Sequence, residues 1–171
     1  AVVFLSDPYK PGSDVMLLKL GEEDFESLEA DQLAVQGMMS SRYLATFEVE
    51  VTAWQKELST VAEIFLALTD VQRKWSYLEP LFIGSDEVRK ELPEDAKRFE
   101  GLNSSVITIL KEMHATGNVK AACNKAGLVK AMEDITAGLD KCEKSLADFL
   151  AGKQRGLFDM FDVLGLRNAQ A

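Results

Sequence analysis

The sequence predicts an all-α fold: an elongated antiparallel helical bundle with a long central helix and a small N-terminal β-hairpin. The first observation is an apolar residue at every third or fourth position from Phe47 to Phe82, the repeat of one helical face. The second is that neither Gly nor Pro occurs between Ser40 and Glu79, so nothing there interrupts a helix. The third is that two later segments carry the same spacing and supply packing partners.

The central helix is the longest predicted element, about 54 Å at 1.5 Å per residue. Its stripe changes phase where two successive steps of three run from Phe65 through Leu68 to Val71. Trp54 and Trp75 are both in register with the stripe, and we expect both to pack between helices. The structural stripe comprises Phe47, Val51, Trp54, Leu58, Val61, Phe65, Leu68, Val71, Trp75, Leu78 and Phe82.

Residues 1–21 are predicted to form the β-hairpin. Short aliphatic and β-branched runs at 2–5 and 15–20 are separated by a stretch that contains Pro8, Pro11 and Gly12. A two-stranded hairpin is marginal alone. We therefore expect it to lean on the helices or to pair with a further segment.

A first helix is expected from about 22 to 39. Its first turns carry six acidic residues and no basic one, and negative charge there favours the positive end of the helix dipole. Gly37 softens the helix near its end. Ser40 and Ser41 form a joint before the central helix begins near Tyr43.

Glycine and proline divide the remainder into shorter helices. Gly84 fits the end of the central helix, and Ser85 fits the start of one short helical turn. Pro93, followed by two acidic residues, begins a helix that we expect to end near Thr116, just before Gly117.

The last helix is predicted from about 127 to 154, after a short turn at 119–123. Apolar residues recur at steps of three and four from Leu128 to Phe149. The chain is thereby divided into a hairpin segment 1–21, a helical bundle segment 22–155 and a tail 156–171 that has no assigned structure.

Composition excludes several classes of partner. The 171 residues carry a formal charge of −9, with a pI near 4.7, and such a surface repels nucleic acid and anionic lipid. Two cysteines form no disulfide framework, which favours a reducing, cytoplasmic setting. The longest apolar runs, Ile64–Leu68 among them, have five residues, far fewer than the ~20 of a membrane span. We expect that the N-terminal stretch is not a signal peptide and that the chain is a piece of a larger protein.

No constellation of catalytic or metal-binding residues is evident. The one Gly-Lys pair, Gly152-Lys153, lacks the remaining residues of a phosphate-binding loop. His114 is the single histidine, and we expect it on the surface near a helix end. Cys142 lies on an apolar stripe and is predicted to be a core residue, whereas Cys123, in a connection, is a candidate reactive thiol. A catalytic, cofactor-binding or metal site is therefore not predicted.

Several strings resemble one family. They are the segments 41–47, 47–65, 71–99 and 123–154, and the strings W-S-Y-L-E-P-L-F-I-G-S at 75–85 and L-P-E-D-A-K-R-F at 92–99 are especially specific. Together they resemble the linker region of dynein heavy chains, most closely the β-type chain of the axonemal outer arm. The resemblance covers about Phe25 to Arg155, and the tail departs from it.

The resemblance implies a mechanical part. In that family the linker is a lever that swings over the AAA+ ring during ATP-driven movement along microtubules, so ATP and Mg²⁺ would belong to the parent motor and no cofactor to this segment. The implied partners are the AAA+ ring and the remaining linker, with dynein intermediate or light chains or neighbouring arms as further ones. The implied location is the cytoskeleton, in the axoneme of a cilium or flagellum. We expect no direct contact with the acidic microtubule, nucleic acid or membrane.

A lever of packed rods flexes where its packing is weakest. The candidate flex points are Gly37, Ser40, Leu68, Val71 and Gly84, and the phase slip from Leu68 to Val71 is favoured. One alternative stays open, a generic helical scaffold or coiled-coil adaptor that binds partners through apolar helix stripes. A carboxylate-bridged metal enzyme would need Glu-x-x-His pairs on facing helices, which a single histidine cannot supply.

Overall fold

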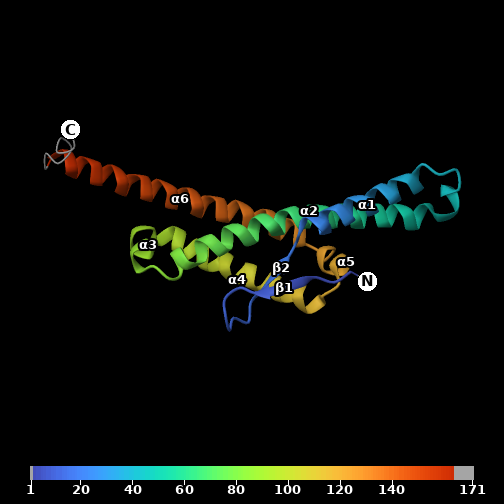
Figure 1. Ribbon diagram of the computed structural model, residues 1–171, viewed down its shortest axis with the longest axis horizontal. Helices are drawn as coiled ribbons and strands as arrows, with labels where there is room; N and C mark the ends of the chain where they lie inside the picture. The colour runs from blue at the N-terminus through green and yellow to red at the C-terminus, as the bar shows by residue number, and fades with distance from the viewer. Residues whose placement is uncertain (1, 164–171) are drawn as a thin grey trace.

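The computed structural model describes residues 2–163, and of residues 158 and 161–163 only the backbone. Six helices and one two-stranded antiparallel sheet follow each other along this part of the chain (Figure 1). The predicted all-α class with an N-terminal hairpin is therefore confirmed. In chain order the elements are β1 (Leu5–Pro8), β2 (Met16–Lys19), α1 (Glu22–Met39), α2 (Leu44–Phe82), α3 (Asp86–Glu91), α4 (Pro93–Thr116), α5 (Val119–Cys123) and α6 (Leu128–Val163).

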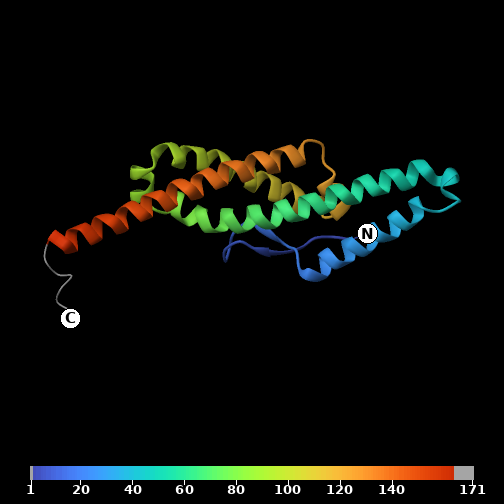
Figure 2. The same cartoon turned by 90° about the horizontal axis from the view of Figure 1, so that it is seen from above.

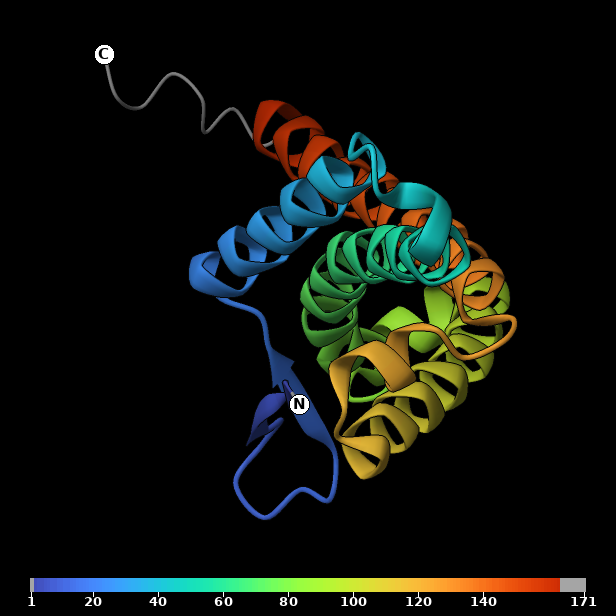
Figure 3. The ribbon, with the colours of Figure 1, turned by 90° about the vertical axis from the view of Figure 1, so that its right-hand side faces the viewer.

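The helices form an elongated body with a three-helix core. The larger part of α2 packs with α4 and α6, and Figure 3 shows these three helices around a common centre. At one end α1 folds back along the first turns of α2, and the two together form an arm (residues 22–57) that extends beyond α4 (Figures 1 and 2). At the opposite end the last turns of α6 extend past α3. The described part of the chain is thus long and narrow, with the two-helix arm at one end and the overhang of α6 at the other.

The core is entirely apolar among the described residues. Its largest fully buried side chains come from α2, α4 and α6, and the rings of Phe82 and Phe99 stack with centroids 5.3 Å apart. The indole Nε1–H of Trp75 is satisfied by the side-chain oxygen of Asn103, at 2.8 Å. At one point α4 and α6 approach closely, because Gly138 leaves room for the side chain of Leu102. The prediction that Trp75 packs between helices is confirmed.

Helix ends follow the expected local chemistry. The Ser85 hydroxyl accepts a hydrogen bond from the Val88 N–H, and Pro93 occupies the first turn of α4. Gly117 ends α4 with a φ of 69°, a conformation that disfavours any side chain. Gly84 is required for another reason, since a Cβ there would lie 2.5 Å from the carbonyl oxygen of Pro80.

The hairpin forms, but its first strand differs from the predicted run at 2–5. Leu5–Pro8 pairs with Met16–Lys19, with Leu5 opposite Lys19. Residues 2–4 pair instead with the connection between α4 and α5, where the Phe4 N–H donates to the Gly117 carbonyl and the Val119 N–H donates to the Val2 carbonyl, both at 3.0 Å. The backbone groups of residues 2–4 thus form hydrogen bonds with a segment distant in the sequence rather than with β2.

The last helix is longer than predicted. It was expected to end near 154, yet α6 continues to Val163, so residues 156–163 of the tail are helical. The segment after Gly152 and Gly156 contains no proline, and each glycine costs only about 1 kcal/mol relative to alanine. Residues 164–171 of the tail lie outside the described residues.

Candidate functional site

A groove of about 520 Å³ lies where the hairpin, α1, α2 and α5 meet. At its floor the rings of Phe4 and Phe65 lie 6.4 Å apart, and the ring of Phe25, which is outside the lining, lies 5.5 Å from that of Phe65. The apolar residues that line the groove are Val2, Val3, Phe4, Leu5, Leu20, Leu28, Trp54, Leu58, Val61, Phe65 and Val119. Trp54 forms part of the wall and is 47% exposed.

Both cations that line the groove are already paired. Lys120 forms an ion pair with Glu57 at 2.9 Å, and its Nζ lies 4.0 Å from the centre of the Trp54 ring. Lys19 forms an ion pair with Asp7 at 2.9 Å. The two carboxylates of the lining, Asp24 and Asp31, both come from α1.

The predicted stripe is buried over most of its length but not at its start. The eight residues from Leu58 to Phe82 in the stripe are all buried. Phe47 and Trp54 are exposed and Val51 is half-buried, so the prediction that Trp54 packs between helices is wrong. The physical reason is that α4 and α6 pack on the later turns of α2, whereas its first turns extend beyond α4 (Figures 1 and 2) and are covered by α1, with Lys120 of α5 over the Trp54 ring.

The candidate flex points lie in different surroundings. Leu68 and Val71 are both buried and both have helical geometry, so α2 is continuous across the phase slip. The break within α2 is at Phe47, with φ −128° and ψ 19°, close to the joint at Ser40–Tyr43. The spacing of apolar residues did not predict this break, because Phe47 fits the stripe. Bending at any of these points stays a prediction.

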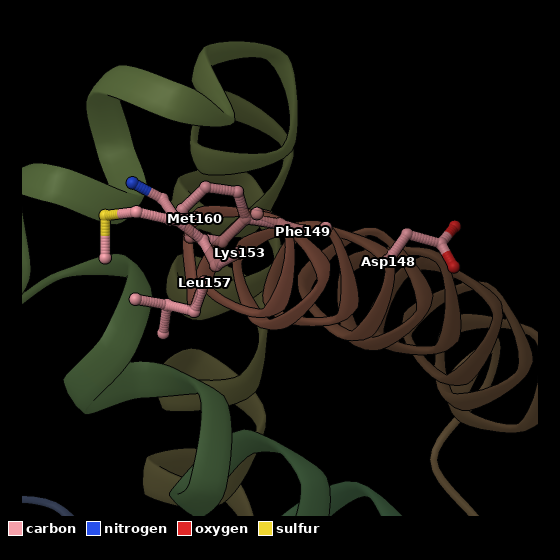
Figure 4. Close-up of a pocket in the computed structure, with 7 residues that line it drawn as sticks. Asp148, Phe149, Lys153, Leu157 and Met160 are labelled. Carbon is pink, nitrogen blue, oxygen red and sulfur yellow. The ribbon is translucent and has the colours of Figure 1, made fainter. Parts of the chain in front are cut away.

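The overhang of α6 carries a second apolar surface. Figure 4 shows Phe149, Lys153, Leu157 and Met160 on one side of the helix, with Asp148 directed away from them. All the residues that line this hollow belong to α6, so it is a shallow feature of one helix rather than an enclosed site. Lys153 also pairs with Glu87 of α3 at 3.1 Å, which ties the start of the overhang to the core.

The titratable residues named from the sequence are not assembled into a reactive centre. His114 is exposed near the end of α4, as predicted, with its Nδ1 3.1 Å from the Ser6 hydroxyl. Cys142 is buried in the core, which confirms its predicted place. Cys123 is also fully buried, and burial raises the pKa of its thiol to about 12. The hypothesis of a reactive Cys123 is therefore wrong, because the thiolate is disfavoured.

The remaining predicted features have no ligand-binding geometry. Gly152 and Lys153 lie within α6, so their backbone is helical rather than a loop that curls around a phosphate. Within residues 2–163, no group of three or more acidic, histidine or cysteine side chains is arranged to hold a metal ion. None of the helices in the described part of the chain combines the length and apolar composition needed to cross a bilayer.

Comparison with known proteins places the chain in a family. The family model described as "Dynein heavy chain, N-terminal region 2" matches residues 1–161. The chain is 44% identical to a ciliary dynein beta chain of Heliocidaris crassispina over 94% of its length, and 40% identical to the flagellar outer-arm dynein alpha chain of Chlamydomonas reinhardtii over 91%. It is also 40% identical to human dynein axonemal heavy chain 17 over 88% of its length.

These relatives are much longer than the chain, which spans 3–4% of their length. The match nevertheless includes the hairpin and all the helices up to residue 161. The resemblance found in the sequence strings is thereby confirmed. The chain belongs to the dynein heavy chain family and corresponds to part of its N-terminal region.

Proposed function

We propose that this chain is a segment of the linker of an axonemal dynein heavy chain, the lever that swings over the AAA+ ring during ATP-driven movement along microtubules. The observation that carries the proposal is α2, which passes from the core into the arm with helical geometry from Glu48 to Phe82. A continuous helix packed on both neighbours transmits force along its axis, because bending it would deform every turn. Family membership supplies the motor context.

The proposed lever does no catalysis itself. We assign ATP and Mg²⁺ to other parts of the parent chain, and we expect the isolated 171 residues to hydrolyse no ATP. The proposed partners are the AAA+ ring and the rest of the linker, with dynein intermediate or light chains or neighbouring arms beyond them. The names of the relatives include flagellar outer arm, ciliary and axonemal, and these support a place in the axoneme. The charge of −9 argues against contact with the acidic microtubule surface.

Distance measurements in the full heavy chain test the proposal. Dyes on Ala126→Cys, which is exposed, and on the first AAA module should change their separation between the ATP and ADP states. The two native cysteines are buried and should not take up label. A control pair on Pro11→Cys, in the connection between the hairpin strands, and Ala126→Cys, in the connection before α6, should keep its separation. If the separation of Ala126→Cys from the first AAA module does not depend on nucleotide, the lever function is wrong.

A further pair of dyes tests bending within α2. Glu50→Cys lies after the break at Phe47, and Lys90→Cys lies in α3, so the pair spans the phase slip from Leu68 to Val71. A nucleotide-dependent change in this distance supports bending inside the segment. A constant distance, together with movement relative to the AAA module, means that the segment moves as a rigid body. The alternative function, a static helical scaffold, predicts that no distance changes.

A further inference from the structure

The apolar groove beside Trp54 is bordered by an unusually acidic helix pair. Residues 22–50 contain eight acidic residues and one basic residue, Arg42, so they carry a charge of −7 out of the −9 of the whole chain. None of these eight carboxylates forms an ion pair with another of the described residues. Charges of one sign that lack cationic partners repel each other and attract a cationic ligand. Asp24 accepts a hydrogen bond from the neutral Gly21 N–H at 2.7 Å, which leaves its negative charge in place.

The lining of the groove repeats with a helical period on α1. Asp24, Ser27, Leu28 and Asp31 follow each other at steps of three, one and three, so they share one face of that helix. The two carboxylates are seven residues apart, or about 10.5 Å along the axis. Two basic residues seven positions apart on another helix have the same separation, so a helix laid along α1 would bring both pairs together.

The size of the groove favours one face of a helix over a whole one. A three-turn helix about 16 Å long and about 10 Å wide occupies more than about 1,000 Å³. The groove holds about 520 Å³, and its walls include two helices, α1 and α2. Apolar side chains at i, i+3, i+4 and i+7 of an amphipathic helix enter such a groove while its polar face stays in solvent.

We propose that this groove is the docking site for a basic amphipathic helix of a partner protein. Apolar side chains of the partner contact Trp54 and the phenylalanine floor, and its Lys or Arg side chains pair with Asp24 and Asp31. Lys19 and Lys120 do not oppose this arrangement, because each is already neutralised by a carboxylate. The inference stands on the groove and its charge, and does not depend on the lever function.

Trp54 gives the site its own spectroscopic signal. The chain has two tryptophans, and Trp75 is only 1% exposed, so a change of emission on binding reports on Trp54. The probe is a synthetic 18-residue amphipathic helix with leucine at the apolar positions and lysine on the polar face. The matched probe replaces every lysine by glutamate. We expect a blue shift with the lysine peptide, weakened by added salt, and none with the glutamate peptide.

Charge variants with matched controls locate the binding. The double variant Asp24→Asn and Asp31→Asn should weaken binding of the lysine peptide about fivefold. The control, Glu26→Gln and Glu29→Gln, removes the same charge from the same helix at positions outside the groove, and should weaken it less than about twofold. Equal weakening by both pairs would mean unspecific attraction to an acidic surface, and would overturn the proposal.

Aromatic variants test the apolar half of the interaction. Trp54→Ala should weaken binding at least about tenfold, measured by the anisotropy of a labelled peptide. Tyr77→Ala, which removes another exposed aromatic side chain from α2, should leave binding unchanged. Circular dichroism of each variant establishes that it is folded. Unchanged binding by a folded Trp54→Ala protein would contradict the proposed site.

The proposal of a partner helix would also be overturned if the groove were occupied by a second copy of this chain or by another segment of the same heavy chain. A second copy would give a concentration-dependent shift of Trp54 emission and a dimer in sedimentation without any peptide. If another segment of the same heavy chain occupied the groove, a longer piece of that chain would show a blue-shifted Trp54 emission and would not bind the lysine peptide. Trp54 that remains exposed in the longer piece and responds to the lysine peptide supports a separate partner.

Discussion

The side-chain amide of Gln72 in α2 makes two hydrogen bonds with the backbone of Leu18 in β2. Its Oε1 accepts from the Leu18 N–H at 2.8 Å, and its Nε2 donates to the Leu18 carbonyl at 3.1 Å. The amide takes the place of a neighbouring strand, so both polar groups of an edge-strand residue are satisfied. This pair of bonds holds the hairpin against the middle of α2 in one register.

Replacing Gln72 is expected to loosen the hairpin. Gln72→Ala leaves the N–H and the carbonyl of Leu18 without partners in a half-buried place, which should lower the free energy of unfolding by about 1–3 kcal/mol. Urea unfolding followed by circular dichroism measures the change. Gln55→Ala on the exposed face of the same helix is the control and should change stability by less than about 0.5 kcal/mol. Equal stability of both variants would show that the two bonds contribute nothing.

The ionisation of Tyr9 is expected to make the free energy of unfolding depend on pH in the alkaline range. Burial raises the pKa of Tyr9 above its ordinary value of 10.0, and the hydrogen bond that its hydroxyl donates to Glu79 and the charge of that carboxylate raise it further. The folded chain therefore keeps this proton when the unfolded chain has lost it. The resulting stabilisation is complete below pH 10 and is lost as the pH rises above it.

Absorbance at the tyrosinate band measures this titration directly. The chain has three tyrosines, and one of them should ionise later than the others in the folded state. Tyr9→Phe should remove the late step and flatten the loss of stability above pH 10, whereas Tyr77→Phe, at an exposed position, should leave both unchanged. A late step that persists in Tyr9→Phe would assign it to another residue.

The close approach of α4 and α6 depends on Gly138. A Cβ at this position would lie 2.7 Å from one methyl carbon of Leu102, so Gly138→Ala should destabilise the core by about 1–3 kcal/mol. Gly101→Ala, with open space around it in α4, should instead gain up to about 1 kcal/mol from helix propensity. Combining Gly138→Ala with Leu102→Ala should cost less than the sum of the two single changes, because the clash is then removed. Strict additivity in this cycle would rule out the contact.

Alanine substitution at two of the candidate flex points should change the free energy of unfolding in opposite directions. Gly84→Ala brings a Cβ to 2.5 Å from the Pro80 carbonyl oxygen, a backbone atom that cannot turn away, and should destabilise by about 1–3 kcal/mol. Gly37→Ala meets nothing within 4 Å and should stabilise α1 by about 0.5–1 kcal/mol. Thermal unfolding compares them. A stabilising Gly84→Ala would mean that the turn after α2 is not constrained as described.

Local chemistry was enough to predict most helix boundaries. Glu22 and Met39 bound α1 as expected, and Pro93 and Gly117 bound α4, because caps, prolines and glycines act within a few residues. The apolar spacing likewise predicted which side chains of α2 are buried from Leu58 onward. Both kinds of signal come from the helix itself, so no knowledge of the neighbouring elements was needed.

The features missed by the sequence all depend on distant partners. The first strand begins at Leu5 because residues 2–4 pair with the connection after α4, a segment more than 100 residues away. Trp54 is exposed because α4 and α6 do not reach that end of α2, although its spacing is the same as that of Trp75. Hydrophobic periodicity indicates which face of a helix is apolar, but not how far along the axis that face is covered.

The shared membership of α2 in the arm and in the core has a mechanical consequence. Its turns beside α1 and its turns beside α4 and α6 belong to one helix, continuous from Glu48 to Phe82, so a movement of the arm after the break at Phe47 would be transmitted toward Trp75 and Phe82. The hairpin is fixed to the same helix by Gln72 and Glu79, one on each side of Trp75. Rotating this helix about its axis would therefore strain those hydrogen bonds, so the small sheet opposes such a rotation.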